Sequence, residues 1–426
     1  MAQKSLCKDA LTAMHSSIRV LLVIGYVWPE PNSSAAGGHL LSLMRMFQAQ
    51  GWVLHFASPA ARGEHECNLD AEEIRTHEIV LNCGSFDSFV SELNPNMVLF
   101  DRFMMEEQFG WRVAQACPTA LRVLDMEDFH SLRYARHEAV KKGGSYQEAD
   151  LLTEKAKREV AAIFRCDLSL VISEVEMELL VSQYQTPEEI LIWCPFLLAD
   201  MPKEVPSFEE RQHFISIGNF RHAPNWDAVL WLKKEIWPLV SQELPKAELH
   251  IYGAYPPPKA VQLNAPQERF LVKGWASDAR EVMSHARLCL APLRFGAGLK
   301  GKLTEAMLCG TPSVTSSVGA EGIQGTFAWP GALADDAENF AKKAVAIYSD
   351  AQEWTLRQTR AGDLLEKRFD RKEITERVLS RVESCYDDLQ AHRSRNFIGQ
   401  MLQHQTMKAT QYMSQWIEAK CQITHH

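Results

Sequence analysis

Short apolar runs alternate with amphipathic stretches along this chain, and this alternation limits the possible folds more than any other feature. The first run is Arg19 to Gly25, RVLLVIG, and a loop and a helical pattern at His39 to Ala49 follow it. Further strand-like runs lie at 53–57, 97–100, 120–124, 168–172 and 190–193. Such short apolar runs between helices are typical of buried parallel strands. The pattern predicts an α/β fold with a doubly wound sheet.

The same alternation restarts after Pro195 to Glu209, a stretch rich in proline and acidic residues that is typical of a linker. Strands are expected at 214–217, 249–252, 270–272 and 288–291, and helices at 226–243, 336–349 and 352–369. We therefore predict a Rossmann-like domain at 19–195, a linker at 196–210 and a second such domain at 211–370. Two such domains place a site in the cleft where the carboxyl ends of both sheets face each other.

Residues 371–426 are expected to form helices that pack back on the N-terminal domain. In residues 390–426, basic side chains outnumber acidic ones, and aromatic and methionine side chains are interspersed. The alternative for this segment is a dedicated contact with a partner or an acceptor.

Charge and cysteine usage narrow the class of protein. The net charge of −9 argues against a non-specific nucleic-acid binder. The ten cysteines form no CxxC pair and several lie in apolar runs, which favours reduced core thiols over a zinc site. No signal peptide is recognised before Arg19, and no apolar run is long enough to span a membrane. We expect a cytoplasmic protein, for which peripheral contact with the inner membrane face stays open.

The segment Leu290 to Thr315, LAPLRFGAGLKGKLTEAMLCGTPSVT, combines glycines, two lysines and a helix start. Gly298 and its neighbouring glycines leave backbone N–H groups open to an anion, and Lys300 and Lys302 add positive charge. A helix is expected to begin near Leu303, and Glu305 can accept hydrogen bonds from a ribose diol. The alternative is a glycine-rich loop that only turns a strand into a helix.

This segment resembles the donor-binding segment of family 4 retaining glycosyltransferases, also described as glycosyl transferases group 1. The resemblance rests on Pro292-Leu293-Arg294, on the glycines and lysines, and on Glu305-Ala306-Met307 with Gly310-Thr311-Pro312. It implies the GT-B architecture, in which two Rossmann-like domains face a central cleft. It also implies metal-independent, retaining hexosyl transfer in carbohydrate biosynthesis, with a nucleotide-diphosphate sugar as co-substrate and no other cofactor. The family has a further glutamate eight positions before Glu305, where this chain has Ala297.

The resemblance implies further site residues. Gly37 and Gly38 match a glycine pair that approaches the donor or the acceptor, and Arg221 in GNFRHAPN is the substitute for a phosphate-binding arginine. The resemblance also places His130 on a sugar hydroxyl and Asp128 on the acceptor nucleophile. Capping of the following helix is the alternative for Asp128. Lys302 and Lys300 are expected to offset charge on the departing diphosphate, and no metal is expected.

A basic run follows at Arg133, Arg136, Lys141 and Lys142. It is either a solvated helix face or a surface that attracts an anionic acceptor or a membrane. The acceptor class stays open among a glycan, a lipid-linked sugar and a small molecule.

Two other functions compete with sugar transfer. One is a GT-B protein that binds a sugar nucleotide without turnover, which the missing glutamate at Ala297 keeps open. The other is a dinucleotide-dependent oxidoreductase, which is disfavoured because no GxGxxG follows a strand.

Overall fold

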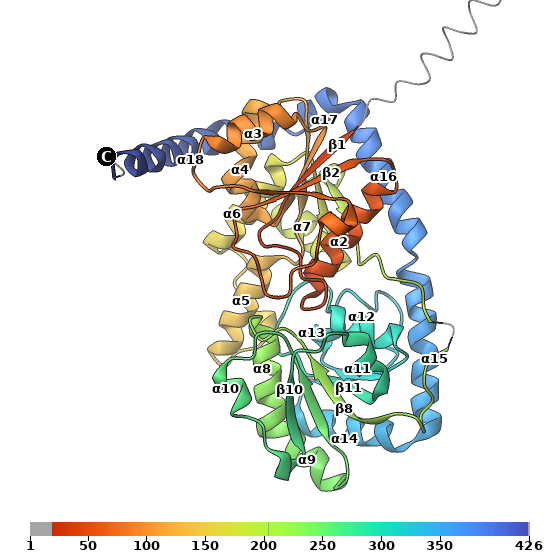
Figure 1. Ribbon diagram of the computed structural model, residues 1–426. Helices are drawn as coiled ribbons and strands as arrows, with labels where there is room; N and C mark the ends of the chain where they lie inside the picture. The colour runs from red at the N-terminus through yellow and green to blue at the C-terminus, as the bar shows by residue number, and fades with distance from the viewer. Residues whose placement is uncertain (1–18, 203, 425–426) are drawn as a thin grey trace, which may run out of the picture.

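The computed structural model describes residues 19–202 and 204–424, which form two α/β lobes (Figure 1). Each lobe is built around one parallel sheet with hydrophobic cores against it. Residues 1–18, where we expect no signal peptide, lie outside the described residues, as do position 203 and residues 425–426. The two sheets confirm the predicted α/β class.

The sheet of the N-terminal lobe has seven strands in the order β3-β2-β1-β4-β5-β6-β7, and all its pairs are parallel. In chain order the strands are β1 (Val20–Ile24), β2 (Val53–Ser58), β3 (Arg75–Glu78), β4 (Met97–Asp101), β5 (Leu121–Asp125), β6 (Leu168–Val171) and β7 (Leu191–Trp193). The strands predicted for this half are confirmed. Strand β3 was not predicted, because its residues RTHE contain no apolar run.

Helices connect these strands. They are α2 (Ala35–Gln48), α3 (Ser85–Leu93), α4 (Phe103–Ala116), α5 (His130–Lys141), α6 (Glu154–Arg165) and α7 (Glu174–Tyr184), with 3-10 turns at Asp70–Glu72, Tyr146–Glu148 and Glu188–Ile190. Helix α2 begins at Ala35 rather than at His39. The reason is that the side chain of Ser34 accepts a hydrogen bond from Gly37 N and caps the helix.

The start of α5 corrects one alternative of the sequence analysis. The capping position is Phe129, and the side chain of Asp128 does not cap the helix. Instead, the Glu159 carboxylate on α6 accepts hydrogen bonds from His130 N (2.9 Å) and Ser131 N (2.7 Å). The capping role considered for Asp128 is therefore wrong, and its carboxylate is available to other partners.

The sheet of the C-terminal lobe has six strands in the order β10-β9-β8-β11-β12-β13. They are β8 (Gln212–Ile217), β9 (Leu249–Tyr252), β10 (Phe270–Gly274), β11 (Ala286–Ala291), β12 (Ser313–Thr315) and β13 (Ala332–Leu333). The four predicted strands are confirmed as β8 to β11. Strands β12 and β13 have three and two residues and are too short to leave a periodic pattern.

The helices of the C-terminal lobe are α8 (Ala223–Trp231), α9 (Trp237–Glu243), α10 (Pro258–Val261), α11 (Ala279–His285), α12 (Gly301–Leu308), α13 (Ser317–Ala320), α14 (Ala337–Ser349) and α15 (Ala351–Arg368), with a 3-10 turn at Pro266–Glu268. The helix expected at 226–243 begins at Ala223, and a π-helical segment at Leu232–Ile236 joins α8 to α9.

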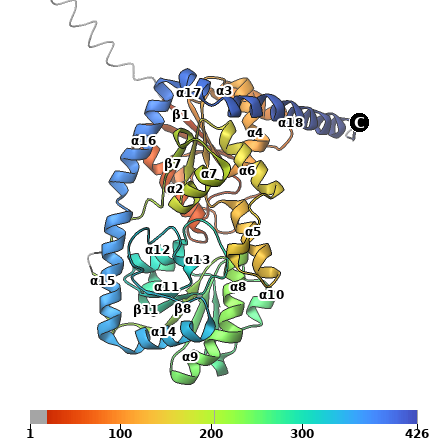
Figure 2. The same ribbon diagram turned by 180° about the vertical axis from the view of Figure 1, so that it is seen from behind.

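The chain crosses between the lobes twice. It first crosses after β7, where residues 194–202 and 204–211 contain no helix or strand, and it crosses back between α15 and α16. The last helices are α16 (Arg371–Asp387), α17 (Leu389–Arg395) and α18 (Phe397–Thr424). Helix α15 runs along the C-terminal lobe and α16 along the N-terminal lobe (Figures 1 and 2). Ile374, Val378 and Val382 on α16 enter the core beside β1 and β2.

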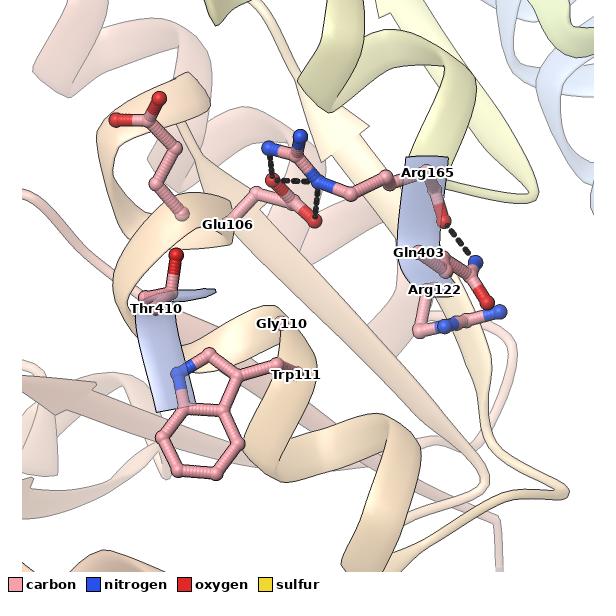
Figure 3. Close-up of a pocket in the computed structure, with 8 residues that line it drawn as sticks. Glu106, Gly110, Trp111, Arg122, Arg165, Gln403 and Thr410 are labelled. Atoms are coloured by element: carbon pink, nitrogen blue, oxygen red, sulfur yellow. Dashed lines mark hydrogen bonds and ion pairs between the residues drawn. The ribbon is translucent and has the colours of Figure 1, made fainter. Parts of the chain in front are cut away.

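Helix α18 packs on α4 and α6 of the N-terminal lobe. Gln403 Nε2 donates to Arg165 O (2.7 Å), and Arg112 Nη2 donates to Ser414 Oγ (2.9 Å). A gap of about 10 Å³ remains between these helices, beside the Arg165–Glu106 ion pair (Figure 3). This volume holds about one water molecule, so the gap is a packing defect rather than a ligand site.

No helix within residues 19–202 and 204–424 has both the length and the apolar character needed to cross a membrane.

Candidate active site

The glycine-rich loop after β11 leads into α12 and touches the opposite lobe. Helix α12 begins at Gly301, slightly before the predicted Leu303. Gly298 has a φ of +61°, and a Cβ there would lie 2.6 Å from Asp128 Cβ. A Cβ on Gly301 would lie 2.4 Å from Ala35 Cβ, at the first residue of α2. Glycine is therefore required at both positions by the close approach of the lobes.

The start of α12 thus faces the start of α2 across the lobe interface. Ala35 and Gly301 are the first residues of these two helices. The N-terminus of each helix carries a partial positive charge from its aligned peptide dipoles. Two such ends at one place favour an anion between the lobes.

Lys300 and Lys302 add full positive charges at the same helix start. Lys300 Nζ donates to Gly298 O (2.8 Å), and Lys302 Nζ donates to Asn225 Oδ1 (2.7 Å). Neither ammonium forms an ion pair within the described part of the chain. Burial lowers the pKa of each lysine to about 8. Both groups are therefore mostly charged at neutral pH and have no carboxylate partner in contact.

Glu305 lies three residues after Lys302 on α12, so the two side chains lie on neighbouring positions of one helix face. Its carboxylate is 38% exposed and lies 3.9 Å from Arg280 Nε. Burial raises the pKa of Glu305, and the charge of Arg280 partly opposes this rise. The carboxylate is accessible to a ligand bound at the start of α12.

Arg221 lies in the loop after β8. Its guanidinium carbon is 3.5 Å from the centre of the Tyr255 ring, and Tyr255 Oη donates to Glu30 Oε1 (2.6 Å) on the N-terminal lobe. The Arg221 side chain is exposed and forms no ion pair among residues 19–202 and 204–424. The stacking holds Arg221 beside the lobe interface.

On the N-terminal lobe, Asp128 lies between His130 and Arg133. His130 Nε2 is 3.2 Å from Asp128 Oδ1, and Arg133 Nη1 donates to Asp128 Oδ2. Burial alone would raise the pKa of Asp128, but Arg133 and His130 hold it well below its usual range. Burial also lowers the pKa of His130, against the pull of Asp128. The pair is thus an ionised carboxylate beside a buried imidazole, and it touches the loop at Gly298.

The glycine pair Gly37-Gly38 lies in the first turn of α2. Gly37 N donates to Ser34 Oγ (3.1 Å) and Gly38 N to Ser34 O (3.2 Å), so both amides are used within the helix cap. Both residues remain beside the interface because Ala35 touches Gly301.

Comparison with solved structures identifies the fold. The chain is similar to Anabaena HepE bound to UDP and glucose, with a TM-score of 0.65, 13% identity, and coverage of 86% of this chain and 100% of that one. It is similar to sucrose-phosphate synthase from Thermosynechococcus elongatus, with a TM-score of 0.61, 15% identity and coverage of 88% and 99%. The chain has the GT-B fold. Similarity to S. aureus TarM in complex with UDP is lower, with a TM-score of 0.55, 12% identity and coverage of 69% of this chain but only 57% of that one.

Residues 211–350 match the family described as glycosyl transferases group 1. This match falls on the C-terminal lobe and contains the glycine-rich loop, both lysines and Glu305. No curated protein sequence matches the chain. The N-terminal lobe is therefore related to the GT-B proteins by its fold alone.

The GT-B interface also contains a carboxylate that the sequence analysis did not select. Glu176 Oε1, on α7 of the N-terminal lobe, accepts hydrogen bonds from Phe129 N (3.0 Å) and from Gly298 N (2.6 Å) on the other lobe. Burial raises the pKa of Glu176 to about 7. The backbone N–H of Gly298, which we expected to face an anion, therefore already donates its hydrogen bond to Glu176. No sequence signal marks it, because it is an acidic residue near the start of an ordinary helix.

The basic run on α5 takes part in a second contact between the lobes. Arg136 forms a two-pronged ion pair with Glu321 (2.7 and 2.9 Å) and donates to Gly296 O (2.8 Å). Arg133 is paired with Asp128, as described above. Two of the four cations are thus directed at the interface rather than at solvent, while Lys141 and Lys142 are exposed.

Proposed function

We propose that this protein is a retaining glycosyltransferase that moves a hexosyl group from a nucleotide-diphosphate sugar to a hydroxyl acceptor. The observation that carries the proposal is the convergence of two helix N-termini, at Ala35 and Gly301, beside Lys300 and Lys302. The family match of residues 211–350 and the UDP bound by similar GT-B proteins support the same reaction. Retention is inferred from the sequence resemblance.

In this reaction the bond between the anomeric carbon and the diphosphate breaks, and a bond to the acceptor oxygen forms. The acceptor proton leaves with the diphosphate. Negative charge grows on the diphosphate as the bond breaks, so cations fixed in advance stabilise the transition state more than the ground state. We assign this role to Lys300, Lys302 and the start of α12, in place of a metal ion. The Glu305 carboxylate accepts hydrogen bonds from the ribose diol.

The N-terminal lobe supplies the acceptor side in this proposal. His130 hydrogen-bonds a sugar hydroxyl, and Asp128 orients His130 and the acceptor. Arg221 and the first turn of α2 at Gly37 and Gly38 line the donor phosphates. The acceptor is a glycan, a lipid-linked sugar or a small molecule.

The unpaired buried thiols suit the reducing cytoplasm, where sugar nucleotides would reach the enzyme. Peripheral contact at the membrane face is part of the same proposal.

Binding without turnover is the second candidate. It is favoured by Ala297, which replaces the family glutamate, and by the Gly298 amide already bonded to Glu176. The two functions differ in whether the sugar leaves its diphosphate.

Calorimetry with a panel of nucleoside diphosphates and their sugar forms, starting with UDP and UDP-glucose, tests the proposal. Release of the diphosphate with a suitable acceptor, and a product whose anomeric configuration matches the donor by NMR, is the expected result. Binding without any release would support the second candidate. Affinity for a nicotinamide cofactor but for no sugar nucleotide would refute both.

A further inference from the structure

Three carboxylates meet at the carboxyl ends of β4 and β5 in the N-terminal lobe. Asp101 and Asp125 end these strands and are paired in register, and Glu127 follows two residues later. One oxygen atom from each side chain lies within 4.8 Å of the other two. The three residues are 2%, 1% and 6% exposed. We call them the carboxylate cluster.

Several oxygens of this cluster have no hydrogen-bond partner within the described part of the chain. Asp101 Oδ2 accepts from Tyr26 N (3.0 Å), and Asp125 Oδ1 accepts from Glu127 N (3.3 Å). Asp101 Oδ1, Asp125 Oδ2 and Glu127 Oε1 are buried and accept no hydrogen bond within the described part of the chain. Glu127 receives no hydrogen bond on its side chain there at all. Buried polar atoms without a partner are rare in folded proteins and costly, so these oxygens need a ligand or a proton.

The charges do not balance either. Arg102 is the cation beside the cluster, with Nε 3.7 Å from Asp101 Oδ1. Three carboxylates and one guanidinium leave two negative charges, and the next carboxylate, Asp128, is already paired with Arg133 and His130. Burial and the nearby Asp101 raise the pKa of Asp125 to about 7, and burial and Asp125 raise the pKa of Glu127 well above its usual value. Two protons or one divalent cation would restore the balance.

We propose that Asp101, Asp125 and Glu127 bind one hard divalent cation. Oxygen-only ligand sets suit Ca²⁺, Mg²⁺ and Mn²⁺ rather than zinc. Three oxygens that lie within 4.8 Å of one another can close around one such ion with small shifts of the side chains.

The proposed ligands lie apart in the chain from the lysines that we assign to the diphosphate. All three ligands belong to the N-terminal lobe, whereas Lys300 and Lys302 belong to the other lobe. Residues 125–127 lead directly into Asp128 and His130, so a bound ion would fix the backbone that presents these side chains. The proposal does not depend on the proposed function, because it concerns binding of the ion itself.

The test is calorimetric titration of the full-length, EDTA-treated protein with CaCl₂, MgCl₂ and MnCl₂, together with thermal unfolding. We expect one ion per chain and a rise in Tm with ion concentration, and the three titrations rank the ions by affinity. Asp125→Asn and Glu127→Gln should each weaken binding at least about tenfold. Glu159→Gln is the matched control, because Glu159 is an equally buried carboxylate of the same lobe that bonds backbone amides of α5, and it should keep the ion.

The wild-type titration keeps the proposal falsifiable if a variant does not fold. Absence of heat and of any Tm change with millimolar ion would show that protons balance the cluster. In that case Asp125→Asn and Glu127→Gln should raise the Tm of the ion-free protein, since a buried amide is neutral without taking up a proton. Ion binding that survives in both folded variants would also overturn the assignment. So would loss of UDP binding after EDTA treatment, which would place the ion on the diphosphate.

Discussion

The two lobes carry their candidate residues in different ways. On the C-terminal lobe, Lys300, Lys302 and Glu305 belong to one loop and the first turns of α12, so chain proximity brings them together. On the N-terminal lobe, Asp128 and Glu176 come from different elements, and the carboxylate cluster joins the ends of two strands. The candidate donor residues of the C-terminal lobe therefore form a local motif that can be recognised in sequence. The candidate residues of the N-terminal lobe come together only when the sheet has formed.

The largest expected effect tests the local motif. Lys302→Ala should lower the maximal rate of transfer by about 10²–10³-fold, because a fixed cation is lost where charge develops. Donor affinity should change less than the rate. Steady-state kinetics of the variant beside Lys302→Arg and the exposed control Lys234→Ala provide the measurement. A weaker affinity with an intact maximal rate would make Lys302 a binding residue only.

The next prediction tests the proposed division of sugar and nucleotide contacts between the lobes. His130→Ala should reduce transfer about 100-fold through loss of a positioned group, while affinity for the nucleoside diphosphate stays within about twofold. The reason is that the proposed function assigns the nucleotide contacts mainly to Lys300, Lys302 and Glu305 of the C-terminal lobe, and assigns His130 to the sugar. Transfer assays and calorimetry on the same preparation separate the two quantities. Loss of nucleotide binding in a folded His130→Ala protein would contradict this division of roles between the lobes.

Removing the ribose contact should affect binding rather than chemistry. Glu305→Ala is expected to weaken nucleoside diphosphate binding by about 1.5–3 kcal/mol, the usual value of a hydrogen bond to a charged group. Calorimetry reports the difference, with Glu305→Gln as the variant that keeps one acceptor oxygen. Folding should be unchanged because the side chain is partly exposed. Unaltered affinity in Glu305→Ala would remove Glu305 from the donor site.

The smallest effect concerns pH. Both lysines have a pKa of about 8 in the ligand-free protein, and the diphosphate binds their protonated forms. Affinity for the nucleoside diphosphate should therefore be nearly full at about pH 7 and fall as pH rises through 8 to 9, by at most about tenfold for each lysine. Lys302→Arg should flatten this profile, because arginine stays protonated. A profile that is flat in the wild type and unchanged in Lys302→Arg would contradict the contact.

The sequence revealed much of the fold because buried parallel strands are apolar along their whole length. It missed β3, which is polar, and β12 and β13, which are very short. It placed the start of α2 too late because the Ser34 cap was not considered. It also offered a capping role for Asp128 that Glu159, far away in the chain, fulfils instead.

The candidate site was predictable only in part, for a related reason. The loop and α12 can be recognised in the sequence because their glycines, lysines and glutamate have a fixed spacing. Glu176 and the carboxylate cluster have no such spacing, since their partners depend on strand order and on how the lobes meet. The roles of the selected residues remain predictions that the variants above examine.

The double crossing between the lobes has a mechanical consequence. The first crossing runs against α15, where Met201 lies beside Gly362, and the second is the α15–α16 junction on the same side of the molecule (Figure 1). Two connections on one side of the molecule form a hinge. They allow the lobes to rotate about the line that joins the two connections, and they resist translation and twisting of one lobe against the other. Cleavage of the first connection would therefore leave the halves attached yet free to swivel, and the alignment of Gly298 with Asp128 would loosen before either half unfolded.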